Sequence, residues 1–151
     1  MRHIHQEARV QAPIEHVFEL ARQVDRQPEW NPYMEMRDWS GPVDKVGTTF
    51  ASTMRLLGQE IRSKSTVVAA EPLRLIHIHG VADNGGTSDW IYRFEPSGDT
   101  TLCTLDIDYE IPGTIAAIVD RLVYHGALDR ATRHMAENFA AVAEAKVPQL
   151  A

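Results

Sequence analysis

The chain contains a single cysteine, Cys103, and lacks an apolar run long enough to be a signal peptide or a membrane span. One cysteine cannot form an internal disulfide. This excludes a domain held together by its own disulfides and is typical of proteins in a reducing compartment. We therefore expect a cytoplasmic protein without a membrane-spanning segment.

Concentrated positive charge is also lacking. The formal net charge is −6 at pH 7, and the lysine and arginine residues are scattered among acidic ones. Because nucleic-acid binding depends on clustered basic residues that contact phosphates, we expect no nucleic-acid partner. The sequence also lacks a nucleophile elbow, a Walker loop, a dinucleotide-binding fingerprint and the spacing of a zinc site, so no cofactor is expected.

The remaining composition is that of an ordinary globular protein, with 44% hydrophobic and 24% charged residues. Neither a Gly/Ser-rich linker nor an internal repeat divides the chain, so we expect one domain over residues 1–151. A chain of this length buries about two thirds of its unfolded surface, which is enough to fold without a disulfide or a metal ion.

Hydrophobic periodicity and turn signals predict an antiparallel sheet. Turn-forming sequences at 58–59, 83–86 and 96–99 separate segments that are strand-like in composition. After the first strand, Pro13 suits the first turn of a short helix, and a second short helix or turn covers 25–32. The expected strands are 4–11, 35–40, 48–57, 60–69, 73–81, 88–95 and 101–111.

A long amphipathic helix is expected to follow the last strand. Pro112-Gly113 ends that strand, and Thr114 is placed to cap the helix. Gly126 either kinks the helix, makes room for a ligand or is simply tolerated. The residues that recur every three or four positions on one helical face are Ile118, Leu122, His125, Leu128, Thr132, Met135, Phe139 and Val142.

The predicted fold class is α+β: a curved antiparallel sheet of about seven strands around the C-terminal helix, with two short helices after the first strand. Strand alternation turns Trp90, Tyr92, Ile107 and Tyr109 inward, because the opposite face of the last strand is acidic and unpaired buried carboxylates are costly. We expect these residues and Leu122 to line an apolar cavity of roughly 300–1,000 Å³ between the sheet and the helix.

Several short motifs occur in an order that resembles one superfamily. They are Ala12-Pro13-Ile14-Glu15-His16-Val17-Phe18, Trp30-Asn31-Pro32-Tyr33, Gly47, Glu71-Pro72-Leu73-Arg74-Leu75, Gly98-Asp99-Thr100-Thr101-Leu102 and the segment 109–113. Over nearly the whole chain they resemble the START-like (SRPBCC) superfamily, which includes polyketide cyclases/dehydrases and birch-pollen-allergen-like helix-grip proteins. The iron triad of the ring-hydroxylase members is missing. The tryptophan-rich entrance and paired polar residues of aromatic polyketide cyclases are only partly matched.

The resemblance implies a protein that binds an apolar, cyclic or polyketide-like small molecule and that catalyses its cyclisation or dehydration without a cofactor. Since the superfamily supports many activities, two alternatives stay open. One is a non-catalytic carrier or sensor of a lipid or isoprenoid, and the other is a protein-interaction module of the chaperone-cofactor kind. The expected partner is a hydrophobic ligand or substrate, and a homodimer is left open.

Candidate site residues follow from the inward strand faces and from a polar break in the helical stripe. His125 and Asp129 lie one helical turn apart, which favours their contact, and Tyr109 carries an inward hydroxyl that needs a partner. For an enzyme, Tyr109, His125 and Asp129 are the candidate catalytic residues. The alternative is an ordinary core with a surface pair beside it. The candidate ligand-binding residues are Trp30, Tyr33, Met54, Ile76, Ile78, Trp90, Tyr92, Ile107 and Leu122.

Two His-x-His pairs, His3-x-His5 and His77-x-His79, each place two imidazoles on one face of a strand. Neutral imidazole is a common metal ligand. Because no third ligand is evident from the sequence, we expect no metal site, and we expect His77 and His79 on the outer face opposite Ile76 and Ile78.

Overall fold

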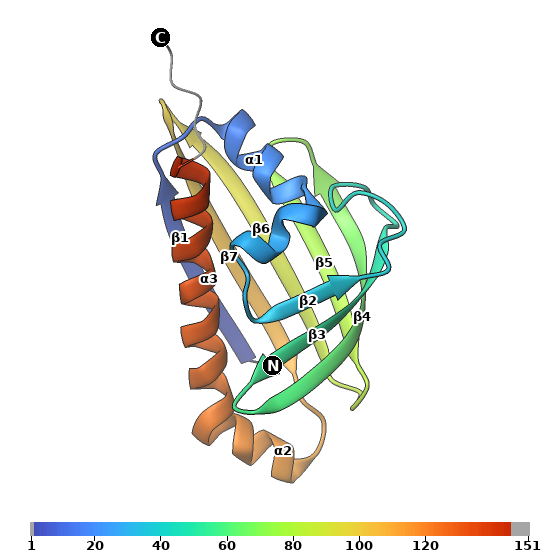
Figure 1. Cartoon of the computed structure of the whole chain (residues 1–151). Helices are drawn as coiled ribbons and strands as arrows, with labels where there is room; N and C mark the ends of the chain where they lie inside the picture. Colours follow the sequence, from blue (N-terminus) through green and yellow to red (C-terminus); the bar gives the residue numbers. More distant parts are fainter. Residues whose placement is uncertain (1, 146–151) are drawn as a thin grey trace.

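The computed structural model describes residues 2–145, together with the side chains of all of these except 115–117 and 121. One antiparallel sheet of seven strands, in the order β1-β7-β6-β5-β4-β3-β2, curls around the long helix α3 (Figure 1). The predicted α+β class is confirmed. The strands are β1 (Arg2–Val10), β2 (Met34–Arg37), β3 (Thr49–Leu56), β4 (Gln59–Glu71), β5 (Leu75–Ala82), β6 (Thr87–Ser97) and β7 (Thr100–Glu110).

The two short helices predicted after the first strand are present. Helix α1 (Ile14–Arg22) begins directly after Pro13 and buries Val17, Phe18 and Leu20, and the 3₁₀ helix η1 (Val24–Glu29) follows it. Together they cover one end of the concave face of the sheet (Figure 1). The apolar spacing of α1 explains this position, because one face of the helix must be buried.

Strands β2 to β7 follow one another as an antiparallel meander, and β1 pairs with β7 to form the edge on which α3 lies. Ile78 pairs with Trp90, and Trp90 pairs with Ile107, so one row of apolar side chains crosses the concave face. This face and α3 enclose the core. The alternation that predicted the inward residues is confirmed, since Trp90, Ile107 and Tyr109 are buried and the half-buried Tyr92 packs against the core.

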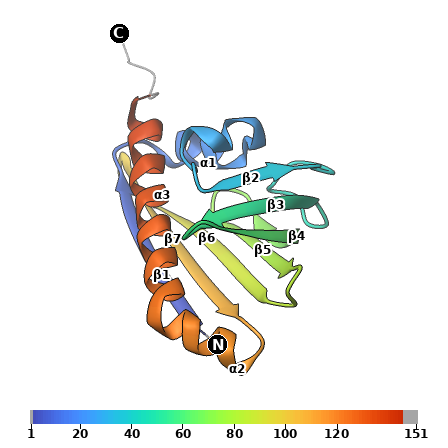
Figure 2. The same cartoon turned by 60° about the horizontal axis from the view of Figure 1, so that its bottom comes forward.

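The C-terminal helix is interrupted, and this is the main correction to the sequence analysis. It consists of α2 (Thr114–Val119), a π turn η2 (Asp120–Tyr124) and α3 (His125–Ala145). A π turn carries an extra residue, and each residue of a helix rotates it by about 100°. The apolar stripe before residue 125 therefore does not continue the face that α3 buries, and α2 bends out of line with α3 and lies beyond the ends of the strands (Figure 2).

The apolar stripe of the sequence predicts that Ile118 and Leu122 pack on the inward face of the sheet, and this prediction is wrong. Their exposed fractions are 50% and 74%, whereas Leu128, Met135 and Phe139, beyond the π turn, are buried as predicted. Gly126 lies in the first turn of α3, and the interruption precedes it.

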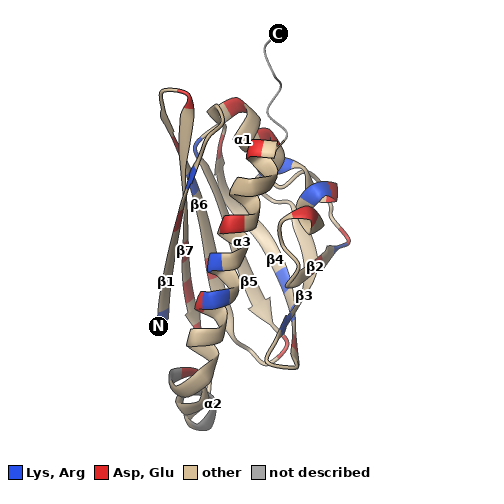
Figure 3. Ribbon diagram, turned by 60° about the vertical axis from the view of Figure 1, so that its left-hand side comes forward, with Lys and Arg blue, Asp and Glu red and all other residues tan. Residues whose placement is uncertain are grey.

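Acidic and basic residues both occur along α3 and are scattered over the strands and loops (Figure 3). Within the described residues, no helix is long and apolar enough to cross a membrane.

Candidate functional site

A cavity of about 730 Å³ lies between the concave face and the π turn. We call it the main cavity. Its volume falls within the range predicted from the curvature of the sheet, and that range is typical of small-molecule sites. Its apolar wall comes mainly from the central strands and from β2 and β3. The wall residues include Met34, Phe50, Met54, Ile61, Trp90 and Ile107.

A row of hydroxyl groups crosses the floor of the main cavity. Ser65, Gly80, Ser88 and Tyr109 are consecutive register partners from β4 to β7, and the two serines and the tyrosine line the cavity. A Cβ atom at Gly80 would lie 3.1 Å from the Ser65 Oγ and 3.2 Å from the Ser88 Oγ. The glycine therefore leaves the hydroxyls accessible on an otherwise apolar floor.

The row ends at a connected group of four polar side chains. The Tyr109 hydroxyl donates to Asp120 Oδ1 at 2.6 Å, and Asp120 Oδ2 lies 3.3 Å from Arg2 Nε. His125 Nδ1 lies 2.9 Å from the same tyrosine oxygen. Because the single phenol proton goes to Asp120, the tyrosine oxygen accepts from the N–H at Nδ1. In the neutral imidazole the remaining lone pair is therefore on Nε2.

The π turn is what brings Asp120 and His125 to one tyrosine. The backbone N–H of His125 donates to the carbonyl of Asp120, which is the i→i+5 bond of a π helix. In a regular α-helix, residues five apart point about 140° away from each other. In the π turn, both side chains reach Tyr109. On the strand side, Arg2 is the register partner of Tyr109.

The phenols of the site are held in their protonated form. Burial is the main cause that raises the pKa of Tyr109, and the hydrogen bond to the Asp120 carboxylate raises it further, against a smaller opposing effect of Arg2. Tyr124 also lines the main cavity, and burial, with the charge of Asp120, raises its pKa to about 12. Near neutral pH, both side chains are hydrogen-bond donors.

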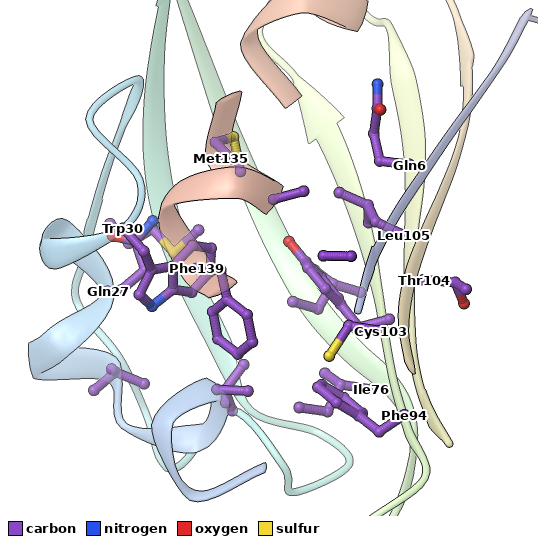
Figure 4. Close-up of a pocket in the computed structure, with 18 of the residues that line it drawn as sticks. Gln6, Gln27, Trp30, Ile76, Phe94, Cys103, Thr104, Leu105, Met135 and Phe139 are labelled. Carbon is purple, nitrogen blue, oxygen red and sulfur yellow. The ribbon is translucent and has the colours of Figure 1, made fainter. Parts of the chain in front are cut away.

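A second, smaller cavity of about 80 Å³ lies under α1 and η1, and we call it the inner chamber (Figure 4). Tyr92, Ile78 and Met36 line both cavities and so form the boundary between them. Burial raises the pKa of Tyr92 well above its usual value. Burial also raises the pKa of the Cys103 thiol, which lines the inner chamber, to about 12, so this thiol is unreactive at neutral pH.

Two residues that line the inner chamber carry buried hydrogen-bond donors. Among the described residues, Gln27 Nε2 and Trp30 Nε1 have no hydrogen-bond partner. Both residues line the chamber opposite Cys103 and Leu105, with Phe139 between them (Figure 4). A buried donor without a partner is costly, so this corner favours a molecule that brings an acceptor oxygen.

The structure divides the predicted ligand-binding residues among several places. Tyr33 donates to or accepts from His134 Nδ1 at 2.8 Å and, like the exposed Leu122, lines neither cavity. The others line at least one of the two cavities. Those in the main cavity are Met54, Ile78, Trp90, Tyr92 and Ile107, and those in the inner chamber are Trp30, Ile76, Ile78 and Tyr92.

Of the three predicted catalytic residues, the structure brings Tyr109 and His125 together and places Asp129 elsewhere. Asp129 accepts from Gln6 Nε2 at 3.0 Å and from Arg133 at 2.6 Å. Within the described part of the chain, no bond joins it to His125, so the predicted contact of this pair is wrong. His125 meets Tyr109 but does not itself line the main cavity.

Asp120 and Arg2 are functional candidates that the sequence analysis missed. Asp120 is 4% exposed and lines the main cavity. The available signal was the need of the inward Tyr109 hydroxyl for a partner. The geometry of the uninterrupted helix that the sequence predicted, however, did not indicate which acidic residue would contact the Tyr109 hydroxyl.

The fold and the cavity define a helix-grip protein, in which a curled sheet and a long helix enclose a ligand-sized space. The sequence model of the family described as "Polyketide cyclase / dehydrase and lipid transport" matches residues 1–144. The chain belongs to this family, and thus to the START-like superfamily that its motifs resemble. The family and the fold support a protein that binds hydrophobic small molecules.

Solved structures share the fold at low sequence identity. A protein from Thermus thermophilus is similar with a TM-score of 0.80 and 17% identity, over 95% of this chain and 98% of that one. The Zhui aromatase/cyclase of a Streptomyces species gives 0.78 and 17%, over 97% and 96%. Ara h 8.0201 gives 0.71 and 10%, over 96% and 99%. None of the curated proteins matches the chain.

Proposed function

We propose that this protein binds an apolar, polyketide-like molecule with carbonyl or hydroxyl oxygens in the main cavity and promotes its cyclisation or dehydration. The observation that supports the proposal is a ligand-sized apolar cavity with a row of hydroxyls ending at the Tyr109–Asp120 pair. Apolar walls suit a carbon skeleton, and the hydroxyls suit oxygens spaced along it. The aromatase/cyclase among the similar structures is consistent with this chemistry.

In this proposal, Tyr109 is the acid and Asp120 is the base. For dehydration of a β-hydroxy ketone, Asp120 removes the proton from the carbon next to the carbonyl. The electron pair forms the double bond, and the hydroxyl leaves as water with the proton of Tyr109. The proton on Asp120 then returns to Tyr109 across their 2.6 Å hydrogen bond, which restores both groups. For ring closure, the same pair forms the enolate and protonates the carbonyl oxygen that is attacked.

His125 and Arg2 are positioning residues in this scheme. The His125 N–H and the Arg2 guanidinium stabilise the negative charge that the pair carries during proton transfer. The cavity itself contributes by holding a flexible chain with its reacting carbons close together, which lowers the entropic part of the barrier.

The inner chamber determines the orientation in which the ligand binds. A ligand that passes Tyr92 brings its far end beside Gln27 and Trp30, whose Nε2 and Nε1 donors have no partner among the described residues. An acceptor oxygen at that end satisfies them, and the reacting end then lies in the main cavity.

Ligand binding is tested by blocking the main cavity. Ser63 lines it, and the next residue, Lys64, is exposed on the outer face. Ser63→Phe should abolish binding of an aromatic polyketide probe, followed by quenching of tryptophan fluorescence, and Lys64→Phe should bind as the parent does. Equal binding by both variants would place the ligand elsewhere.

Catalysis is tested with a poly-β-ketone substrate and the change Tyr109→Phe. Loss of a general acid lowers a rate by about 10²–10⁴-fold, so kcat should fall by that factor while the probe still binds. Tyr33→Phe is the matched control, since its hydroxyl bonds His134 outside both cavities. A wild-type protein that binds the probe but turns nothing over would overturn the catalytic part alone.

The second candidate function is a lipid or isoprenoid carrier. Apolar side chains are exposed around the π turn beside the cavity: Ile118, Val119, Leu122 and Val123. Such a surface suits transfer of an apolar ligand from a membrane or a donor protein. Copurification of a lipid, seen by native mass spectrometry, would favour the carrier. The accessible main cavity favours ligand binding of either kind over an interaction module with a closed interior.

A further inference from the structure

A cluster of nitrogen and oxygen ligands lies on the outer face of the sheet, which is turned away from α3. His3 and His5 of β1 stand opposite Asp108 and Asp106 of β7 in the strand register. Asp106 Oδ1 lies 2.6 Å from His5 Nδ1 and 3.2 Å from His3 Nε2. Among the described residues, these three side chains form the one group of three His, Cys, Asp or Glu ligands whose ligand atoms all lie within 4.8 Å of one another.

The second nitrogen of each imidazole is bound to a further carboxylate. His3 Nδ1 lies 2.7 Å from Asp108 Oδ1, and His5 Nε2 lies 3.0 Å from Glu7 Oε1. Histidines that bind metals almost always donate their other N–H to such a partner, which fixes the tautomer and the ring orientation. Both rings are therefore already oriented with one nitrogen toward Asp106.

We propose that His3, His5 and Asp106 bind one divalent transition-metal ion of the zinc class. Two imidazoles and a carboxylate suit Zn²⁺ and its spectroscopic substitute Co²⁺. The ligands of a tetrahedral zinc ion lie roughly 3.4 Å apart, given bonds of about 2.0–2.1 Å. A small outward movement of the present side chains makes that room, and water completes the coordination. The other oxygen of Asp106 stays with Arg93, at 3.1 Å.

The same face carries a natural comparison of the same composition. Asp89 Oδ1 lies 2.9 Å from His77 Nε2 and 3.1 Å from His79 Nδ1, on strands β5 and β6. Among the described residues, the ligand atoms of His3, His5 and Asp106 all lie within 4.8 Å of one another, and those of His77, His79 and Asp89 do not. If surface histidines bound metal ions in general, the two trios would bind them with similar affinity. If His3, His5 and Asp106 form a specific site, that trio should bind the ion more tightly than the His77 trio.

Metal binding at this place joins the edge strand to its neighbour. β1 has one strand partner, β7, and the ion would tie His3 and His5 to Asp106 across that pairing. The site is independent of the proposed ligand chemistry, since it lies on the opposite face of the sheet.

The test is titration of the metal-depleted chain, prepared without a histidine tag, with Co²⁺ followed by visible absorption and then with Zn²⁺ followed by calorimetry. We expect one ion per chain and the intense Co²⁺ absorption of a four- or five-coordinate site. Cu²⁺ and Ni²⁺ are avoided because they also bind deprotonated backbone amides next to a histidine. The melting temperature should rise with added Zn²⁺.

Two double variants decide the location. His3→Gln with His5→Gln should lose the Co²⁺ absorption and weaken Zn²⁺ binding by more than about 100-fold, beyond the effect of outer partners. His77→Gln with His79→Gln should bind as the parent does. Glu7→Gln should weaken binding by about 10-fold, at the low end for outer partners because the site is exposed. Circular dichroism checks that each variant is folded.

Three outcomes would overturn the proposal: no saturable binding, equal loss in both double variants, or half an ion per chain together with a metal-dependent dimer in analytical ultracentrifugation. The last result would mean that the ion bridges two chains.

Discussion

The two ends of the concave face are built from the same strands but are filled differently. At the end covered by α1 and η1, aromatic rings pack edge to face, with Trp30 on Phe139 at 5.2 Å and Phe18 on Phe94 at 5.3 Å. The inner chamber at this end measures about 80 Å³. At the end near the π turn, the main cavity leaves about 730 Å³. We call these the filled end and the hollow end.

The difference comes from the covering helices. The sheet is continuous, and β6 carries Phe94 into the filled end and Ser88 into the hollow end, while β7 carries Cys103 and Tyr109 in the same way. Two short helices and α3 close the filled end. At the hollow end, α2 bends out of line with α3 at the π turn and lies beyond the ends of the strands (Figure 2). Stability and the candidate site are thus expected to reside at opposite ends of the same strands.

The largest expected effect separates the two ends directly. Phe139→Ala at the filled end should lower the free energy of unfolding by about 3–5 kcal/mol, because a large ring leaves a void among close-packed neighbours. Met54→Ala at the hollow end should cost about 2 kcal/mol or less, since Met54 already faces an open cavity. Urea denaturation measures both. Equal costs would mean that the hollow end contributes as much as the filled one.

The next comparison locates the boundary along the C-terminal helix. Leu128 is 3% exposed and Leu122 is 74% exposed, although both belong to the apolar stripe of the sequence. Leu128→Ala should cost about 2–5 kcal/mol, and Leu122→Ala should stay within about 0.5 kcal/mol. A large loss of stability with Leu122→Ala would mean that Leu122 is buried and that the helix is not interrupted. The π turn would then no longer explain the position of Asp120.

These two leucines also show what the sequence could and could not predict. The sheet, its faces and the buried part of α3 were predictable, because periods of two and of three to four residues follow from local geometry. The π turn was not, because Ile118 and Leu122 keep the spacing of a regular helix while the backbone does not. Asp120 was missed for that reason, and His125 was paired with Asp129 instead of Tyr109.

The cluster on the outer face shows a second limit of the sequence, which concerns contacts between residues that are far apart in the chain. His3 and His5 were visible as a pair, but their third neighbour, Asp106, lies about 100 residues away in the sequence. Only the pairing of β1 with β7 brings it close. A spacing rule cannot anticipate a partner that the register of two distant strands supplies.

A smaller effect tests whether the hollow is kept for function. Ser65→Val adds apolar volume to the cavity floor beside Gly80 and favours the strand, so the free energy of unfolding should rise by about 0.5–2 kcal/mol while ligand affinity falls. Thr66→Val, the next residue on β4, points to the outer face and should change neither by much. If Ser65→Val destabilised the protein, the hollow end would be packed more tightly than the cavity indicates.

The smallest expected effect concerns polar contacts on the outer face of the sheet. If the filled end supplies most of the stability, these contacts should contribute little to it. Burial opposes ionisation of Asp89, but hydrogen bonds from His77 and His79 outweigh it and lower the pKa of this carboxyl below its usual 3.8. Its contribution is therefore present above pH 3.8 and is lost as the pH falls through the lowered value. The side chain is about one-third exposed, so solvent screening limits the contribution to a few tenths of a kcal/mol. Asp89→Asn should lower the melting temperature slightly at pH 7, and the difference from the parent should shrink as the pH falls through the lowered pKa of Asp89. A difference that instead grew on acidification would mean that Asp89 is destabilised when charged, and that the His77–Asp89–His79 contacts do not stabilise the outer face.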